Sequence, residues 1–362
     1  MHLQTEISSL DRAEKTYLIR PVQLNEAQEL LDLVKFSQGG LSSLQPRLDY
    51  LKAYIKSSVE SFAGKKPIDT PHKYLMGLYE IKNDTLIGCA AVKTCIGFES
   101  PFINFDIKGD GLDEYLIASS RYTGATEVGS LFLHPDYRAE GLGRYLAKVR
   151  YMLIATEPWR FGETIIAELR GICGPEGSPL YDYMFQEKLE MSFLDADAQY
   201  YDRDPNALGD IVPIGRIATT DLPANVRASI GHPHQTGISA MRLLQSEGFI
   251  FSGTIDLFDA GPIMSVYRDT IRTVMSSQSA QVKISNDLSE GYTTLIAAGG
   301  ISDFRAIVTT GNPIGTDIIM TSTAQNALKI KEGESLRYWQ SPKKLDHLKR
   351  EIPYTKKARA HV

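Results

Sequence analysis

The sequence predicts an α+β fold with a small all-β subdomain near its C-terminus. Three observations predict it. Strand-like and helical patterns alternate from residue 17 to residue 155. A loop with two glycines joins one strand to the next helix within residues 126–147. Short β-like runs, separated by Gly, Asn and Pro, fill residues 268–341. The first two patterns indicate mixed α and β structure, and the third indicates a separate group of strands.

The first half of the chain contains a regular series of predicted elements. Residues 17–22 read as a strand that Pro21 closes, and residues 74–81 and 85–96 read as strands paired around a turn. Apolar residues at helical spacing predict helices over residues 24–36 and 48–62. The predicted order is therefore strand, helix, helix, strand, strand.

The chain is organised around residues 126–147. An apolar run at residues 128–133 predicts a strand, which Pro135 ends, and the pattern Arg138-x-x-Gly141-x-Gly143 opens a helix. Glycines let a backbone approach a ligand closely, and the free amides at a helix N-terminus attract phosphate. Arg138 and Arg144 add positive charge at the same place. The loop therefore predicts a pyrophosphate-binding site.

Further elements follow the central helix. Residues 191–201 read as an irregular polar segment. Gly248 is predicted to cap the C-terminal end of the helix at residues 238–247. The predicted strands are 164–170, 211–217 and 249–262, and the predicted helices are 181–189, 224–230 and 238–247. The β-like runs of the last part are 273–282, 292–298, 304–309 and 317–321.

These patterns divide the chain into four parts. Residues 1–16 are polar and predict an N-terminal extension, and residues 342–362 predict a basic tail. Between them lie residues 17–267, the main domain, and residues 268–341, the small β subdomain.

Composition limits the classes of function. The net charge of −5 argues against nucleic-acid binding. We expect a cytoplasmic protein without a membrane contact, because no apolar run is long enough to span a bilayer and the first twenty residues do not resemble a secretory signal. We expect no metal, because the 3 cysteines lack metal-ligand spacing and His232 and His234 lack a cluster of further ligands.

The Arg138-x-x-Gly141-x-Gly143 loop between a hydrophobic strand and a helix resembles the acyl-CoA-binding signature of the GNAT N-acyltransferases. The resemblance implies a mixed, mostly antiparallel sheet flanked by helices. It also implies that the strand before the loop separates from its neighbour and hydrogen-bonds the pantetheine arm of CoA. The residues expected to bind acyl-CoA are Leu131, Leu133, Arg138, Gly141, Leu142, Gly143 and Arg144.

Segments along nearly the whole chain resemble one family within that superfamily, the arginine N-succinyltransferases. They are residues 19–22, 39–44, 131–133 with the 135–141 loop, 167–171, His234 ahead of 247–249, 255–262, 304–305 and 323–324. The resemblance implies transfer of succinyl from succinyl-CoA to L-arginine, giving N2-succinyl-L-arginine and CoA. It also implies an oligomer, either of one chain or paired with a related subunit.

The same resemblance implies a catalytic histidine and a backbone contact to succinyl-CoA. Ungapped spacing to residues 247–249 puts the histidine at His234, whereas a shift in the His-Pro-His-Gln-Thr stretch puts it at His232. The backbone contact falls on Leu131. Imidazole accepts and donates protons near neutral pH, as removal of the amine proton and protonation of the leaving thiolate require.

Two strand glutamates are further catalytic candidates. Glu127 opens the central strand and Glu168 lies in the neighbouring strand, so either is a candidate base for the amine or a partner for the histidine. The alternative for each is an ion pair at a strand end, for instance Glu168 with Arg170. The backbone amides of Leu131 and Leu133 are candidates for polarising the thioester carbonyl.

The acceptor needs complementary charges. Arg170 is the candidate for binding the carboxylate of the arginine substrate, and Asp256 is the candidate for binding its guanidinium. Asp259 reads as a turn residue. Residues 39–44 read as a loop that closes over the substrate. Two alternatives remain open: an N-acyltransferase acting on another amine such as ornithine, and a non-catalytic acyl-CoA-binding subunit.

Overall fold

The computed structural model describes residues 16–37, 41, 43–174, 177–200, 211–285, 287–288 and 291–340. The predicted extension, apart from Thr16, and the predicted basic tail lie outside these residues. The same holds for Gly39, Gly40 and Ser42 of the predicted closing loop.

The described residues form one 15-stranded sheet, in the order β12-β15-β11-β14-β13-β1-β2-β3-β6-β7-β10-β9-β4-β5-β8. Neighbouring strands are antiparallel except for β6–β7 and β11–β14. The central strands are β1 (Tyr17–Pro21), β2 (Lys73–Glu80), β3 (Thr85–Lys93), β6 (Thr126–Leu133) and β7 (Thr164–Glu168). The expected mixed, mostly antiparallel sheet is confirmed.

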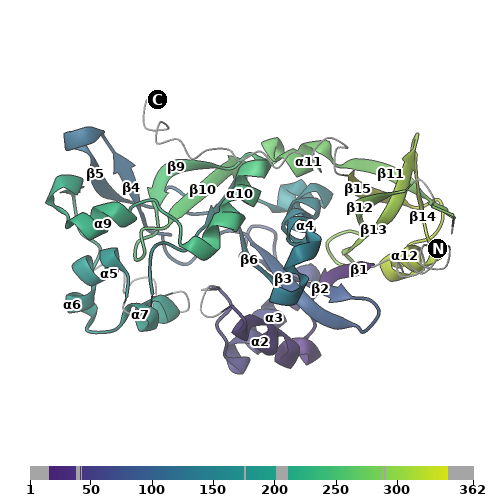
Figure 1. Cartoon of the computed structure of the whole chain (residues 1–362), viewed down its shortest axis with the longest axis horizontal. Helices are drawn as coiled ribbons and strands as arrows, with labels where there is room; N and C mark the ends of the chain where they lie inside the picture. Colours follow the sequence, from purple (N-terminus) through teal and green to yellow (C-terminus); the bar gives the residue numbers. More distant parts are fainter. Residues whose placement is uncertain are drawn as a thin grey trace, which may run out of the picture.

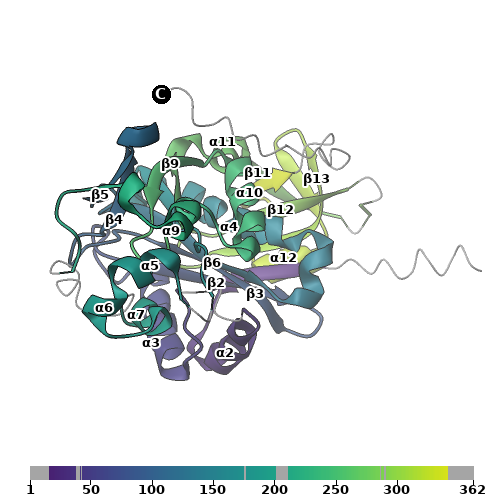
Figure 2. The same cartoon turned by 60° about the vertical axis from the view of Figure 1, so that its left-hand side comes forward.

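Helices cover both faces of the central strands (Figures 1 and 2). Alternate residues of β2 point to opposite faces. Leu75 and Tyr79 pack with α2 (Ala27–Lys35) and α3 (Leu48–Phe62), whereas Met76 packs with α4 (Leu142–Thr156). Both faces of β2 are therefore buried, which explains its almost continuous run of buried residues.

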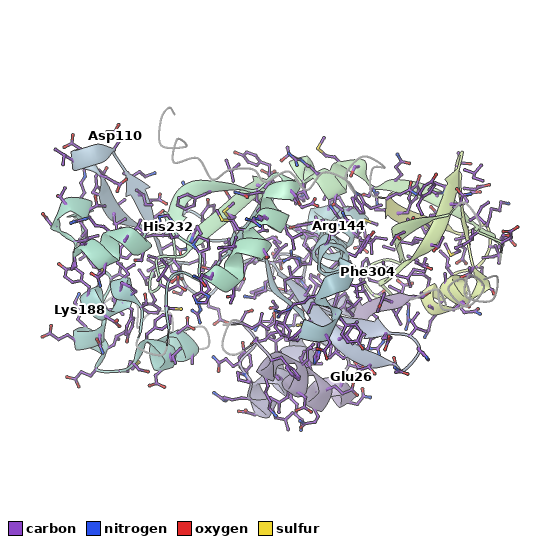
Figure 3. All side chains as sticks on the ribbon, in the orientation of Figure 1. Glu26, Asp110, Arg144, Lys188, His232 and Phe304 are labelled. Carbon is purple, nitrogen blue, oxygen red and sulfur yellow. The ribbon has the colours of Figure 1, made fainter. Side chains whose placement is uncertain are left out.

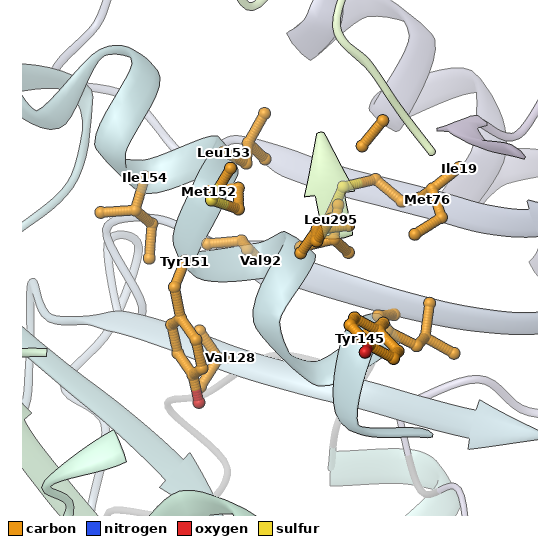
Figure 4. Close-up of a cluster of buried hydrophobic side chains, with 14 of the residues drawn as sticks. Ile19, Met76, Val92, Val128, Tyr145, Tyr151, Met152, Leu153, Ile154 and Leu295 are labelled. Atoms are coloured by element: carbon orange, nitrogen blue, oxygen red, sulfur yellow. The ribbon is translucent and has the colours of Figure 1, made fainter. Parts of the chain in front are cut away.

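Helix α4 is the centre of the main core. Every residue from Tyr145 to Ala155 is buried, and Tyr145, Met152 and Ile154 pack among side chains of the sheet such as Val92 (Figure 4). Full burial of one large apolar side chain contributes about 1.5–3 kcal/mol. This burial anchors the helix against one face of the sheet, with its N-terminus at the predicted phosphate loop.

The sheet continues beyond β7 into a second group of elements (Figure 1). Its strands are β10 (Pro262–Tyr267), β9 (Ile250–Ile255), β4 (Asn104–Lys108), β5 (Tyr115–Ser119) and β8 (Arg216–Ala218). Its helices are α5 (Pro179–Met184), α6 (Gln186–Leu189), α7 (Phe193–Tyr200), α9 (Ala224–Ser229) and α10 (Ile238–Glu247). Helix α10 has the predicted bounds, and Gly248 caps it in the left-handed conformation.

Three sequence predictions need correction here. Residues 193–200 form helix α7 instead of an irregular segment, because Phe193 and Ala196 are buried on one face. The helix expected at 181–189 is interrupted at Phe185. The strand expected at 211–217 begins only at Arg216.

The C-terminal strand region is confirmed. Its strands are β11 (Gln278–Ile284), β12 (Tyr292–Ala298), β13 (Arg305–Ile314), β14 (Asp317–Met320) and β15 (Ser335–Gln340). They close into a ring because β12 pairs with both β15 and β13. The region also carries α11 (Arg272–Ser276) and α12 (Ser322–Leu328), so the β pattern expected from residue 273 starts as a helix. Strand β13 pairs with β1, which joins the ring to the main sheet.

Short 3-10 helices connect these elements. They are η1 (Leu24–Glu26), η2 (Gly111–Asp113), η3 (Pro135–Glu140), η4 (Pro158–Arg160), η5 (Thr219–Asp221), η6 (Gln235–Gly237) and η7 (Arg268–Thr270). The helix expected from residue 24 therefore begins as η1 and becomes α-helical at Ala27.

Candidate active site

Strand β6 separates from β7 almost at once. Within the described residues, their parallel pairing consists of Thr126 with Ile165 and Glu127 with Ile166. The rest of β6 continues beside β3, up to the pair of Leu133 with Gly88. The expected separation of these two strands is therefore confirmed, and it opens the sheet along β6.

A β-bulge lies at the opening. Ala91 pairs with Gly129 and Cys89 with Phe132, so Ser130 and Leu131 together oppose one residue of β3. Ser130 has a positive φ of 51°. Its Oγ lies 2.8 Å from Oγ of Ser43 in the α2–α3 connection. The bulge re-aims the backbone of β6 where a ligand would have to enter.

A cavity of about 160 Å³ occupies the opening. It collects residues from β6, β7, α4, η6, α10 and the α2–α3 connection. The lining residues are Leu41, Ser43, Glu127, Val128, Gly129, Ser130, Leu131, Arg150, Ala167, Glu168, Leu169, Arg170, Thr236, Gly237, Ala240 and Leu244. Among them are four of the residues that the sequence singled out: Glu127, Leu131, Glu168 and Arg170.

Glu127 forms an ion pair with Lys93. Nζ of Lys93 lies 2.9 Å and 3.1 Å from the two carboxylate oxygens, and Glu127 is 7% exposed. Burial alone would lower the pKa of Lys93, but the charge and hydrogen bond of Glu127, together with the nearby Tyr54 and Glu168, give a net upward shift. The ion-pair alternative for Glu127 is thus what the structure shows, with Lys93 as the partner.

Glu168 is the last residue of β7 and pairs with Ile263 of β10. Its side chain is half-buried at the cavity, and its charge also raises the pKa of Lys93. It therefore lines the same cavity as Glu127, from the neighbouring strand. Its role as a base stays a prediction.

Arg170 is the centre of a charged network. Its Nη2 lies 2.6 Å from Asp197 of α7, and its Nη1 lies 3.3 Å from Asp259. The suggested pairing of Arg170 with Glu168 is therefore wrong, because two other carboxylates hold the guanidinium. Burial would lower the pKa of Arg170, but these carboxylates raise it. A substrate carboxylate at Arg170 would compete with Asp197.

Asp256 holds a turn. Its Oδ1 accepts hydrogen bonds from the backbone N–H groups of Phe258 and Asp259, both at 2.8 Å. Burial and the neighbouring charge of Asp259 raise the pKa of Asp256 to about 7. Asp256 does not line the cavity, so the structure gives it a local structural contact, and binding of a guanidinium stays a prediction.

The two histidines differ in their contacts. The backbone N–H of His234 donates to the carbonyl of Arg170 at 2.7 Å, and a β-bridge joins Pro233 to Gly171. Nδ1 of His234 accepts from the N–H of Thr236 and lies 2.8 Å from its Oγ1. His234 therefore caps η6 beside the cavity, which Thr236 lines. The side chain of His232 has no hydrogen bond or ion pair with other described residues, and Figure 3 shows it toward α9, away from Arg144 on α4.

The close packing of this corner depends on Gly171. A Cβ at that position would lie 2.0 Å from the carbonyl oxygen of Asp259. Only glycine lets the end of β7 approach the turn before β10, and that approach positions both Arg170 and the histidine segment.

The predicted phosphate loop is open. Gly141 adopts the left-handed conformation, with φ of 71°, and forms the N-cap of α4. A Cβ on Gly141 would meet nothing within 4 Å, and one on Gly143 would lie 4.0 Å from Leu133. Exposed Arg138 donates from Nε to the carbonyl of Leu133 at 3.2 Å. The loop is thus available to a ligand instead of being packed against protein.

Arg144 and Leu142 complete the loop. Leu142 is 3% exposed and anchors the first turn of α4 in the core. Nε of half-buried Arg144 has no hydrogen-bond partner among the described residues, and its guanidinium lies 5.3 Å from the ring of Tyr145. An unpartnered cation beside free helix amides suits an anion.

Sequence reasoning missed four cavity or network residues: Lys93, Arg150, Thr236 and Asp197. One signal was present for Arg150, because a charge inside an apolar helical stretch needs a reason. The other three depend on long-range packing, and no local pattern marks them.

Two features of other protein classes are absent from the described residues. No group of His, Cys, Asp and Glu in them could hold a metal ion. None of their helices combines the length and apolarity needed to cross a membrane.

Comparisons with known proteins agree along the chain. The family "Arginine N-succinyltransferase beta subunit" matches residues 17–273, and its C-terminal domain family matches residues 278–340. The arginine N-succinyltransferase of Enterobacter sp. (strain 638) is 28% identical over 332 residues, which is 88% of this chain and 96% of that protein. The protein of the same name from Shigella boydii is also 28% identical, with the same coverage. The solved structure of arginine/ornithine succinyltransferase subunit AI from Pseudomonas aeruginosa has a TM-score of 0.79 at 23% identity, over 90% of this chain and 99% of that one, and therefore shares the fold.

Proposed function

The chain belongs to the arginine N-succinyltransferase family, and we propose that it transfers the succinyl group of succinyl-CoA to the α-amine of L-arginine. The products would be N2-succinyl-L-arginine and CoA. The observation that carries the proposal is an open loop at the N-terminus of α4, at one end of β6, together with a cavity between β6 and β7. An acyl-CoA N-acyltransferase needs both features in this order.

We infer the placement of the donor from the loop. The diphosphate of CoA would bind the first amides of α4, beside Arg138 and Arg144. The pantetheine arm would follow β6, and the thioester would lie at the bulge. There the amide of Leu131 or Leu133 would polarise the carbonyl as negative charge develops on its oxygen.

The proposed reaction has two proton transfers. Glu168 would accept a proton from the ammonium of arginine, directly or through a water, so that the neutral amine attacks the thioester carbon. A C–N bond forms and the C–S bond breaks. As the tetrahedral intermediate collapses, its second amine proton passes through water to the departing thiolate, which leaves as CoA–SH.

His234 is proposed to donate a hydrogen bond to that thiolate and so to guide the proton to it. Because its Nδ1 accepts from the N–H of Thr236, the neutral ring carries its proton on Nε2. In this arrangement Nε2 donates, whereas a base at Nε2 would require the other tautomer. Glu127 would contribute through its ion pair, which fixes Lys93 beside the opening.

For the acceptor, Arg170 and Asp256 stay the proposed contacts to the carboxylate and the guanidinium. The acidic surroundings of Arg170 also favour a cationic acceptor near Asp197 and Asp259. We propose that the protein acts as an oligomer of this chain or with a related subunit, which light scattering after size exclusion would test.

Thiol release tests the function. The purified protein is offered succinyl-CoA with L-arginine, with acetyl-CoA and L-ornithine as the matched alternatives. We expect release that depends on both succinyl-CoA and L-arginine. Faster release with ornithine would favour another acceptor, and CoA binding without release from any pair would favour a non-catalytic subunit.

A further inference from the structure

Arg150 is a buried cation in the middle of α4. It is 3% exposed, and the helix around it is buried from Tyr145 to Ala155. Taking a charged group out of water costs several kcal/mol unless other groups compensate. An arginine at this position therefore calls for a partner.

The described residues supply little compensation. Nε of Arg150 donates to the carbonyl of Ala147 at 3.1 Å, which is a bond within the same helix. Its guanidinium lies 5.5 Å from the ring of the neighbouring Tyr151, but no carboxylate of the described residues forms an ion pair with it and its terminal nitrogens have no hydrogen-bond partner among them. The carboxylate of Glu247 acts on it only at a distance, because Lys148 and Thr273 already bind that group. Burial accordingly lowers the pKa of Arg150.

Arg150 also lines the cavity between β6 and β7. Gly129 and Leu131 of the bulge line the same cavity. The unmatched guanidinium is therefore part of the wall that surrounds the proposed thioester position. A cation in such a place suits an anionic ligand group.

The position along α4 favours the acyl donor as the source of that group. Leu142 begins the helix at the phosphate loop, and Arg150 follows eight residues later, which corresponds to about 12 Å of helix. One rigid element thus carries the proposed diphosphate site at its start and a cation two turns further along, under β6. The proposed acceptor contacts, Arg170 and Asp256, come from other elements.

We propose that Arg150 binds the terminal carboxylate of the succinyl group and thereby selects a dicarboxylic acyl-CoA over an uncharged one. The inference rests on the proposed function, of which it names the specificity-determining residue. The planar guanidinium offers two parallel N–H donors to a carboxylate. An uncharged acyl chain would leave this cation buried and unpaired. Discrimination therefore follows both from the ion pair that succinyl forms and from the unpaired charge that an uncharged chain leaves behind.

The test compares succinyl-CoA with butyryl-CoA, which has the same chain length and a methyl group in place of the carboxylate. For Arg150→Met we expect kcat/KM with succinyl-CoA to fall about 10- to 100-fold, and kcat/KM with butyryl-CoA to rise, by up to about tenfold, because the variant removes the charge that an uncharged chain leaves unpaired. Arg150→Lys keeps the charge without the fork, so its preference should be intermediate. If Arg150→Met does not fold, the ratio of the two donors is measured with Arg150→Lys alone. An unchanged ratio of the two donors in both variants would overturn the proposal.

Two further measurements distinguish a failure of this inference from a failure of the proposed function. Calorimetric binding of succinyl-CoA and butyryl-CoA, without an acceptor, measures the preference independently of turnover. If the wild type fails to acylate arginine but binds succinyl-CoA more tightly, and Arg150→Met removes that difference, the inference survives the failure of the proposed function. Agmatine, which is arginine without its carboxylate, tests the other source. If Arg150→Met abolishes discrimination between L-arginine and agmatine and leaves the donor ratio unchanged, Arg150 binds the acceptor and the proposal is wrong.

Discussion

Lys93 of β3 and Glu127 of β6 are register partners, and Nζ of Lys93 lies 2.9 Å from Oε2 of Glu127. Both side chains are largely buried. Glu127 is also the last residue at which β6 still pairs with β7. The ion pair therefore occupies the point where the sheet opens to form the cavity, and it links the stability of the opening to the charge of the site.

Removing one partner of this pair should be costly. Glu127→Gln leaves the Lys93 ammonium buried without its counter-charge, so we expect the free energy of unfolding to fall by about 3–5 kcal/mol. The double variant Lys93→Gln/Glu127→Gln is the matched control and should recover most of that loss. Urea unfolding at pH 7 measures both. A single variant as stable as the wild type would contradict the assignment. Succinyl transfer by the double variant then tests whether Glu127 has a role beyond pairing.

The phosphate loop allows a comparison of two glycines. Gly143→Ala fits the protein, because its Cβ would lie 4.0 Å from the nearest side-chain atom, so the melting temperature should not fall. The same Cβ would occupy the space of a bound diphosphate, so we expect the calorimetric Kd for CoA to rise about tenfold, equivalent to about 1.4 kcal/mol. Gly141→Ala, at φ of 71°, should instead lower stability by about 1 kcal/mol. Wild-type CoA affinity in Gly143→Ala would exclude this loop as the diphosphate site.

The two histidines predict different kinetic effects. His234→Ala should lower kcat about 10²- to 10⁴-fold with little change in the KM for succinyl-CoA, because loss of the hydrogen-bond donor to the thiolate acts on the chemical step. His232→Ala should stay within about threefold of the wild type. Steady-state thiol release measures both, and thermal unfolding controls for folding. The reverse pattern would move the catalytic role to His232.

The raised pKa of Asp256 predicts a dependence of stability on pH. In the folded chain Asp256 keeps its proton up to about pH 7, whereas its ordinary value is 3.8. The resulting stability is fully present at acidic pH and is lost as the pH rises through about 7. Asp256→Asn keeps the acceptor oxygen of the turn but cannot ionise, so its melting temperature relative to wild type should rise between pH 5 and pH 8, on the order of 2 °C. Asp269→Asn is the control, since Arg268 lowers the pKa of Asp269 and the variant should lose stability at pH 8. If the melting temperature of Asp256→Asn relative to wild type fell with rising pH, the raised pKa of this carboxyl would be refuted.

Local patterns predicted the parts of the fold that local physics decides. Helix α10 has an amphipathic face and a glycine cap, and its bounds agree with the prediction. The strand, loop and helix at residues 126–147 agree as well, since the apolar strand, Pro135 and the two glycines each constrain their own segment. Helix α7 escaped prediction because its apolar face is short: among its described side chains, Phe193 and Ala196 belong to the hydrophobic core.

The site was predictable only in part for the same reason. Glu127, Leu131, Glu168 and Arg170 do line one cavity, since the first three lie on the two strands that separate and Arg170 follows the end of β7. The ion-pair partners, however, come from distant segments. Asp197 reaches Arg170 across 27 residues of sequence, and Lys93 reaches Glu127 across 34. Such pairs follow from tertiary packing, which spacing along one segment does not encode.

The identity of the product tests the proposed reaction most directly. Wild-type protein is incubated with succinyl-CoA and L-arginine, and the product is analysed by mass spectrometry and NMR against a reaction with acetyl-CoA. We expect one product, L-arginine with succinyl on its α-nitrogen, formed in equal amount to the CoA released. Free succinate without an acylated amine, or a succinyl group on the guanidinium, would contradict the proposed reaction.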